Sequence, residues 1–329
     1  MNNAEIIICT EQGYLESTSK LLVSTIREFG GKYKDIPIVS YQPRKSKRIS
    51  KDTIKFFEQN NVEFIDIELN NKYPNYSLAN KPLVCAHRES KTSAETLVFL
   101  DSDVLIYSEP NELFEFQDGD VILRPVDSKN IGTNNKSDKN LLYWNNVYQI
   151  LDINIRRYVT TTVTNDRILE YYNSGHISTL TKNRLFNRWL ENFNKVMEKG
   201  FKPVLPNFIE QSIFSATVSQ MELNVKHLGK GYNYPLHNVD KIKNPNYSVS
   251  DTDQIVSAHY HLIFKSQISY HSFVNNLLKT EKGKRIRKLI KEHGVIQQYS
   301  FFVIPKTLLL NQIKRKYNKL KKYVPYQGK

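Results

Sequence analysis

Two carboxylates stand in a stretch of the chain that otherwise resembles a protein core. Residues 96–110 read TLVFLDSDVLIYSEP, so Asp101 and Asp103 interrupt a run of apolar residues. An ionised carboxylate in an apolar setting costs several kcal/mol unless a cation or hydrogen-bond donors compensate it. Paired carboxylate oxygens suit Mg²⁺ or Mn²⁺, above all where a phosphate completes the coordination shell. The spacing therefore predicts a divalent cation, and the alternative is a solvated turn or a helix N-cap.

Strands and helices alternate around this pair. Short apolar runs predict strands, and apolar residues at helical spacing predict helices. The predicted strands are 5–10, 36–41, 62–68, 96–100 and 120–125, and the predicted helices are 16–29, 51–60, 82–93, 185–199 and 210–221. This order is typical of an α/β fold, with a mostly parallel central sheet and helices on both faces. The polar stretch 127–140 has few apolar anchors and is expected to be an irregular loop.

The acidic pair follows the strand at 96–100 and so falls at the carboxyl end of an inner strand. Ligands bind at that edge in open α/β sheets. In extended backbone, Asp101 and Asp103 would point to the same side and converge on one ion, while Ser102 would face away. Lys81, just before Pro82 at the start of a helix, could approach a phosphate from the helix start, but an exposed lysine is the favoured interpretation.

Four motifs in sequence order resemble the metal-dependent nucleotide-sugar glycosyltransferases of the GT-A fold, and glycosyltransferase family 8 is the closest in motif order. They are ICTEQGY (8–14), LDSDV (100–104), YNSGHI (172–177) and AHYHLIFK (258–265). The resemblance covers about residues 5 to 265. A DxD motif by itself is common, whereas the ordered set of four is more specific.

The resemblance implies a sugar donor, a metal and a set of site residues. The donor would be a nucleoside diphosphate sugar, expected to be a UDP-hexose, and the metal would be Mn²⁺ or Mg²⁺. The implied metal ligands are Asp101, Asp103 and His259. The residues implied to contact the donor are Thr10, Tyr14, Asp101, Ser102, Asn173, Gly175 and Lys265. Tyr14 would stack on the base, which is worth about 1–3 kcal/mol by analogy with other base-stacking sites.

The resemblance also implies catalytic roles for Asn173, Glu210 and Gln211. Glu210 and Gln211 stand where the family has an Asp-Gln pair, and either could face the anomeric carbon. Family 8 members retain the anomeric configuration, so retention is expected. A divalent ion would stabilise the negative charge that develops on the departing diphosphate.

Several positions depart from the family pattern or have an ordinary structural explanation. Leu262 replaces the family's glycine, and no Pro-Trp follows Lys265. His261 is a rival to His259 as a metal ligand, and a histidine in a core can also be satisfied by a neighbour. A simple turn would account for 173–175, ordinary packing for Tyr14 and a helix cap for Thr10.

The positive charge is concentrated at the C-terminus. Of the 47 Lys and Arg and 33 Asp and Glu, residues 279–329 hold fifteen and two, a net charge of +13, which leaves +1 for residues 1–278. A neutral body argues against a nucleic-acid partner. We expect a catalytic domain at 1–278, with a nucleotide-binding half at 1–126 and an acceptor- and sugar-binding half at 127–278. A basic helical tail would follow at 279–329.

The tail has two interpretations that the sequence leaves open. Apolar residues recur at spacings of three and four from Leu310 to Val324, and lysines crowd the remaining positions. Such a helix can lie on an anionic membrane surface, at about 1 kcal/mol per basic residue, or pack on the domain with its lysines in water. No run approaches the roughly 20 apolar residues of a membrane helix. A cytoplasmic location is therefore expected, with the inner membrane face as the surface for the tail.

The motifs favour hexosyl transfer from a nucleotide sugar to a glycan or glycolipid acceptor, and two further enzyme classes share some of the same features. A sugar-phosphate nucleotidyltransferase of related fold usually has a Gly-rich loop near its N-terminus, which this chain lacks. A haloacid dehalogenase-type phosphatase places its first Asp near the start of the domain. Here a long α/β stretch precedes Asp101, which disfavours the phosphatase.

Overall fold

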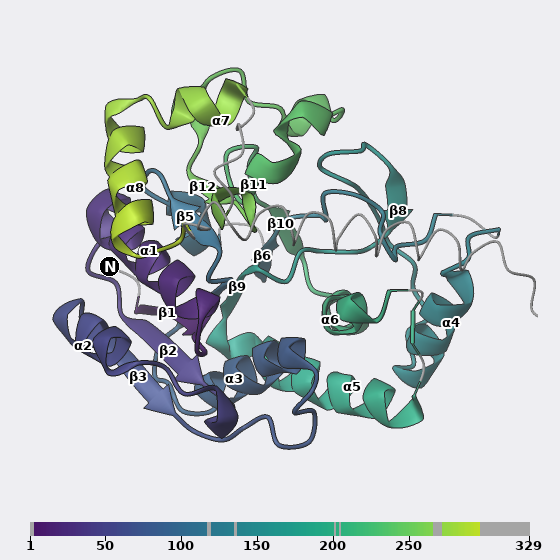
Figure 1. The fold of residues 1–329 in the computed structure, drawn as a ribbon. Coiled ribbons are helices and arrows are strands. Elements are labelled where there is room, and N and C mark those ends of the chain that lie inside the picture. The colour runs from purple at the N-terminus through teal and green to yellow at the C-terminus, as the bar shows by residue number, and fades with distance from the viewer. Residues whose placement is uncertain are drawn as a thin grey trace, which may run out of the picture.

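The computed structural model describes residues 3–116, 120–134, 137–200, 202–203, 205–265 and 272–296, with the side chain of Lys265 left out (Figure 1). Its main sheet contains β1 (Ala4–Cys9), β2 (Ile38–Gln42), β3 (Val62–Asp66), β4 (Thr96–Leu100), β6 (Val121–Leu123), β9 (His176–Leu180) and β10 (Val225–His227). A smaller sheet contains β5 (Val104–Ile106), β11 (Tyr234–Pro235) and β12 (Ser257–His259), and a hairpin joins β7 (Tyr158–Thr160) to β8 (Arg167–Leu169).

The main sheet is mostly parallel, as predicted. Its strand order is β10-β6-β9-β4-β1-β2-β3. Strand β1 pairs in parallel with β2 and β4, and β2 with β3, whereas β9 runs antiparallel to both β4 and β6. The antiparallel β9 reverses the chain direction inside the sheet and brings its start beside the end of β4, with Leu100 opposite His176.

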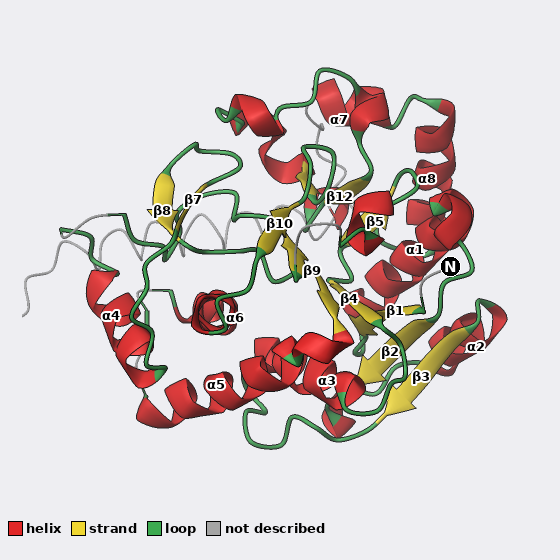
Figure 2. Ribbon diagram, turned by 180° about the vertical axis from the view of Figure 1, so that it is seen from behind, coloured by secondary structure: helices red, strands yellow, loops and turns green. Residues whose placement is uncertain are grey.

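Helices cover both faces of this sheet (Figure 2). The helices that the structure describes are α1 (Tyr14–Phe29), α2 (Lys51–Gln59), α3 (Asn80–Glu89), α4 (Leu141–Ile150), α5 (Leu185–Lys199), α6 (Ile209–Gln220), α7 (Ser272–Leu277) and α8 (Glu281–Glu292), of which α7 and α8 pack with α1 and the smaller sheet.

Alternate residues of the central strands supply two separate cores. Ile7 and Phe99 join the core formed with α3, α4, α5 and α6, whereas Ile8 and Leu100 join the core formed with α1 and α2. Successive side chains of a strand point to opposite faces, so a strand covered on both faces must be apolar throughout. This explains why all five residues of β4 are buried.

The short strands β5 and β12 position Asp103, the last residue of the DSD motif. They pair antiparallel, with His259 opposite Val104. Since β5 directly follows Asp103, this pairing places a histidine that is 156 residues away beside the second aspartate. Neither strand was predicted, because three residues carry too little pattern to reveal a strand.

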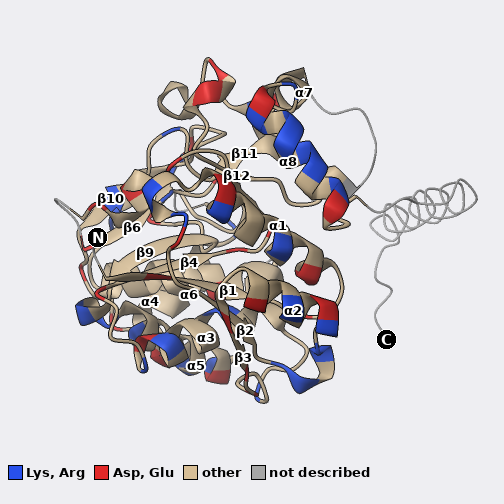
Figure 3. Ribbon diagram, turned by 90° about the vertical axis from the view of Figure 1, so that its left-hand side faces the viewer, with Lys and Arg blue, Asp and Glu red and all other residues tan. Residues whose placement is uncertain are grey.

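The C-terminal part of the described chain packs on the N-terminal helix. Helix α8 buries Ile286, Leu289 and Ile290, and Arg285 forms an ion pair with Glu28 of α1. Figure 3 shows basic residues recurring along α8, and most of them are exposed: Lys282, Lys284, Arg287, Lys288 and Lys291. Within residues 281–292 the apolar side is therefore packed on the domain. The predicted tail segment from Leu310 to Val324 lies outside the described residues.

Among the helices that the structure describes, none combines the length and the apolar character that crossing a membrane requires.

Candidate active site

A cleft of about 590 Å³ opens at the carboxyl ends of the central strands. It is formed by the start of α1, the turn between β4 and β5, the start of α6 and the segment around β12. Eight predicted site residues line it: Tyr14, Asp101, Ser102, Asp103, Asn173, Glu210, Gln211 and His259. Residues far apart in the sequence thus meet at the edge of the sheet where ligands of open α/β folds bind.

Two of the remaining predicted residues do not line the cleft. Thr10 is fully buried, and its hydroxyl hydrogen-bonds Ser19 and Ser40, each at 2.8 Å. Gly175 lies directly behind Asp101, where an added Cβ would approach the carboxylate Oδ2 to 2.4 Å. The third, Lys265, ends a short 3₁₀ turn, and its side chain lies outside the described part of the structure.

The acidic motif is a turn, and the expectation of extended backbone was wrong. Asp101, Ser102 and Asp103 connect β4 to β5, and the Val104 amide donates back to the Asp101 carbonyl at 3.3 Å. Ser102 is also not turned away, because it lines the cleft and accepts a hydrogen bond from the Thr18 hydroxyl at 3.0 Å. The turn gives the two carboxylates different partners.

Asp101 is paired with a lysine. The Lys81 ammonium lies 2.9 Å from each Asp101 oxygen and 3.4 Å from the Ser174 hydroxyl. The prediction of an exposed lysine was wrong, since its side chain is only 13% exposed. Burial alone would lower the pKa of Lys81, but the charges of Asp101 and Glu210 outweigh it and raise the pKa. Lys81 therefore stays charged in the cleft.

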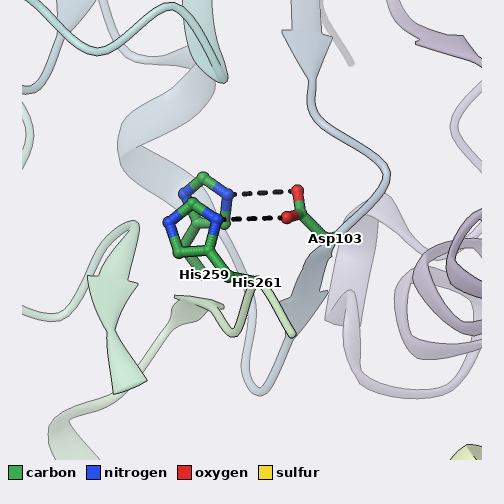
Figure 4. Close-up of side chains that lie close together, drawn as sticks. All are labelled: Asp103, His259 and His261. Atoms are coloured by element: carbon green, nitrogen blue, oxygen red, sulfur yellow. Dashed lines mark hydrogen bonds and ion pairs between the residues drawn. The ribbon is translucent and has the colours of Figure 1, made fainter. Parts of the chain in front are cut away.

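Asp103 faces two histidines (Figure 4). His259 Nε2 lies 3.1 Å from one carboxylate oxygen, and His261 Nδ1 lies 3.3 Å from the other. Burial would raise the pKa of Asp103, but the two imidazoles hold it well below its usual range. Ligand atoms of the three side chains all lie within 4.8 Å of one another. One carboxylate and two imidazoles form a donor set that fits a divalent ion.

The segment 173–175 forms a turn and also borders the cleft, so both of its predicted descriptions apply. The Asn173 side-chain oxygen accepts from the Gly175 amide at 2.8 Å. The Gly175 carbonyl in turn accepts from the Asp101 amide at 2.8 Å. These two hydrogen bonds connect the start of β9 to the acidic turn and hold the Asp101 backbone in place.

Glu210 is a buried carboxyl group on the first turn of α6. One of its oxygens, Oε1, is buried without a hydrogen-bond partner. Burial raises its pKa to about 7, and the nearby Lys81 charge and a hydrogen bond from Ser174 limit the rise. Gln211, the next residue, also lines the cleft. A carboxyl with a pKa near neutral can hold or release a proton at working pH.

Tyr14 and His237 add an aromatic edge and a third imidazole. Tyr14 begins α1, and burial together with the Asp103 charge raises its pKa to about 12. The His237 ring centre lies 4.1 Å from that of His261. Sequence reasoning missed His237. It considered Lys81 only as a residue that could approach a phosphate or be exposed, and not as the partner of Asp101, although a partly buried carboxylate needs a nearby cation.

Two solved glycosyltransferases share the overall arrangement. The chain aligns over 88% of its length with 52% of the bifunctional glycosyltransferase WbbM, at 14% identity and a TM-score of 0.50. It aligns over 90% of its length with 98% of an active-site mutant of LgtC, at 12% identity and a TM-score of 0.50. The chain thus spans about half the length of WbbM. At these identities the likeness shows the fold, which is of the predicted GT-A type.

The amino-acid sequence gives the family directly. A comparison with curated proteins gave no match. The profile of the family described as Rhodobacterales glycosyltransferase domain matches residues 6–221, which is more than half of the 329 residues. The matched range includes the acidic turn, the segment 173–175 and the Glu210–Gln211 pair. The chain therefore belongs to the Rhodobacterales glycosyltransferase domain family and is a glycosyltransferase with a GT-A-type fold.

Proposed function

We propose that the protein transfers a hexose from a uridine diphosphate sugar to a glycan or glycolipid acceptor, with Mn²⁺ or Mg²⁺ as cofactor. The observation that carries the proposal is the cleft of about 590 Å³, which is lined both by the Asp103–histidine cluster and by Glu210 and Gln211. A nucleotide sugar has the same two-part chemistry, an anionic diphosphate joined to a neutral ring of hydroxyls.

The diphosphate would bind at the end that holds Asp103 and Lys81. Asp103 and His259 would hold the ion, which when bound stabilises the negative charge that develops on the departing diphosphate. Lys81 contributes a positive charge held in place by Asp101. Tyr14, at the start of α1, borders the same region and would contact the base.

The sugar would bind between Asn173 and the start of α6. Asn173 and Gln211 carry amides that can hydrogen-bond sugar hydroxyls, and Glu210 can accept or donate a proton near neutral pH. Either Glu210 or Gln211 would face the anomeric carbon. Retention of the anomeric configuration is part of the proposal and follows from the resemblance to family 8.

The acceptor would enter beside the segment 127–140, and a lipid-linked acceptor would bring the protein to a membrane. Asp127, Ser128 and Asn130 line the cleft. The proposed membrane contact is made through residues 279–329, whose part beyond Ser300 contains eight basic residues and no acidic residue. An anionic surface would attract such a segment.

The test is a panel of nucleotide sugars screened with Mn²⁺ and Mg²⁺ for thermal stabilisation and for slow metal-dependent hydrolysis. We expect UDP-hexoses to give the largest effects. Asp103→Asn should lower turnover by orders of magnitude with the fold intact. Asp52→Asn, at an exposed position of α2, is the matched control and should keep wild-type turnover. Near-normal activity of Asp103→Asn would contradict the proposed metal site.

A further inference from the structure

The two aspartates of the turn Asp101–Ser102–Asp103 contact different side chains. Lys81 neutralises Asp101 from 2.9 Å, whereas the partners of Asp103 are both imidazoles. The lysine ammonium contacts both oxygens of Asp101, so this carboxylate is neutralised without a metal ion. Asp103, in contrast, presents one oxygen to each of two imidazole nitrogens. The turn thus separates the two carboxylates that the resemblance would assign to one ion.

Asp103, His259 and His261 bring three ligand atoms within 4.8 Å of one another. Two ligand atoms that each lie about 2.1 Å from a metal, at angles of about 90–110°, are about 3.0–3.4 Å apart. His259 Nε2 lies 3.1 Å from Asp103 Oδ1 and His261 Nδ1 lies 3.3 Å from Oδ2, so each imidazole nitrogen has this separation from its own carboxylate oxygen. The imidazole rings of His259 and His261 are stacked with centres 3.9 Å apart, so both present nitrogens to the same side (Figure 4).

The backbone at His261 brings its ring to this position. Strand β12 ends at His259, and His261 then adopts a φ of 46°, in the left-handed region that side-chain-bearing residues rarely occupy. The Tyr260 amide donates to the Asp103 carbonyl at 3.1 Å and ties this turn to the acidic turn. Strained backbone of this kind persists only where the surroundings fix it, and it concentrates at functional sites.

His237 supports the same cluster from the side. Its ring meets that of His261 edge-on at 4.1 Å, and its Nε2 lies 4.0 Å from Asp127. Its Nδ1 is buried and has no hydrogen-bond partner. A third imidazole beside the cluster adds to the nitrogen-rich character of the site.

We propose that His261 is a metal ligand, so that Asp103, His259 and His261 hold the ion while Asp101 holds Lys81. Imidazole ligands favour later first-row transition ions, whereas Mg²⁺ prefers an octahedral shell of oxygens. The site should therefore bind Co²⁺ more tightly than Mn²⁺ and bind Mg²⁺ weakly. This inference deepens the proposed function, because it names the ligands and the class of ion for the same cleft.

Metal titration of the full chain by calorimetry tests it, with Co²⁺, Mn²⁺ and Mg²⁺ each added alone and then with uridine diphosphate. We expect His261→Asn to weaken Co²⁺ binding at least about tenfold. Asparagine suits this variant because it tolerates the left-handed backbone. Asp101→Asn should change the affinity by no more than about twofold. His227→Asn, at an exposed histidine of β10, is the matched control.

Pulsed electron paramagnetic resonance of bound Mn²⁺ gives a second readout, because it detects coordinated imidazole nitrogens. Couplings from two imidazoles are expected in the wild type and in Asp101→Asn, and from one imidazole in His261→Asn. Full binding by His261→Asn together with lost binding by Asp101→Asn would overturn the inference, and so would the absence of binding by every form. Binding through His261 without any sugar transfer would instead contradict the proposed function alone.

Discussion

Glu210 shows how the charges of the cleft balance at the level of single residues. Lys81 is the cation beside both Asp101 and Glu210, and the carboxylate of Asp101 is the one in direct contact with it. Burial of Glu210 is therefore only partly compensated, and its pKa rises to about 7. Because Glu210 gains or loses its proton near neutral pH, its protonation state affects both the free energy of unfolding and the chemistry of the cleft.

Glu210→Gln should change the pH dependence of stability. Below the usual pKa of 4.5, the carboxyl is protonated in both the folded and the unfolded chain, so it does not lower the free energy of unfolding. Between 4.5 and about 7 the unfolded chain releases the proton while the folded chain keeps it, so stability falls as pH rises. The full penalty, about 3 kcal/mol at 1.4 kcal/mol per pH unit, is present above pH 7. The neutral amide avoids this penalty.

Thermal or urea unfolding at two pH values measures this effect. At pH 8 Glu210→Gln should be more stable than the wild type by up to about 3 kcal/mol, and at pH 5 by less than about 1 kcal/mol. Glu58→Gln, at an exposed position of α2, should show no such difference. Equal stability gains at both pH values would mean that the carboxyl is not held protonated by burial.

The sequence predicted the residues of the site better than their contacts. Eight predicted residues line the cleft, since their types and order carry the chemistry. The different partners of Asp101 and Asp103 were not predicted, because extended backbone was expected where the structure has a turn. His261 was identified only as a rival to His259. Whether one or both imidazoles face Asp103 depends on the backbone angle at His261.

At the level of elements, long periodic segments were predicted well and short strands were not. β4 and α5 have their predicted bounds, because a continuous apolar run and a strong helical period define them. The predicted helix 82–93 instead spans Asn80–Glu89 and ends early, where the Lys91 and Thr92 amides both turn back to the Arg88 carbonyl. Strands β5, β9 and β12 form through pairing with distant partners, which local pattern does not contain.

Gly175 couples two of these elements, and Gly175→Ala should lower turnover without unfolding the protein. The added Cβ would lie 2.4 Å from Asp101 Oδ2 and 2.9 Å from its Cγ, so the Asp101 side chain must rotate away from Lys81. Misplacement of a site group by about 1 Å can cost on the order of a hundredfold in rate. The atoms in the way belong to a side chain, so the melting temperature should change little.

The comparison of turnover numbers and melting temperatures should include the Asp101→Asn background as a control. If Gly175 acts by positioning Asp101, alanine at 175 should cost less there than in the wild type, because the effects of coupled residues do not add. Wild-type turnover of the single Gly175→Ala variant would show that the position of Asp101 does not matter for transfer.

Helix α8 is a structural part of the domain. The loss in the free energy of unfolding on substituting one of its core residues should measure its contribution to the fold. Ile290 is 1% exposed and belongs to the core that also contains Leu21 of α1 and Leu105 of β5. Ile290→Ala should therefore cost about 2–5 kcal/mol in the free energy of unfolding. Lys288→Ala, on the exposed side of the same helix, should cost less than about 0.5 kcal/mol. Urea unfolding distinguishes the two, and equal small effects would mean that α8 contributes little to the fold.

Across the whole molecule, the positive charge is concentrated after residue 278. Residues 1–278 carry a net charge of +1, and residues 279–329 carry +13. Part of this charge lies along α8 (Figure 3), where Lys282, Lys284, Arg287, Lys288 and Lys291 are exposed while Ile286, Leu289 and Ile290 are buried. Eight further basic residues follow Ser300. The two groups can be separated by truncation, because α8 ends at Glu292.

Sedimentation with anionic vesicles should therefore depend on the residues after Ser300. At about 1 kcal/mol for each basic residue near the surface, eight such residues suffice for binding at low salt, and the binding should weaken as salt rises. A chain that ends at Ser300 keeps α8 and its packing on α1, so it should remain folded but stay in the supernatant. Neutral vesicles serve as the control for both forms. If both forms stay in solution, the proposed membrane contact is wrong, whereas sedimentation of both forms would assign the contact to the outer side of α8.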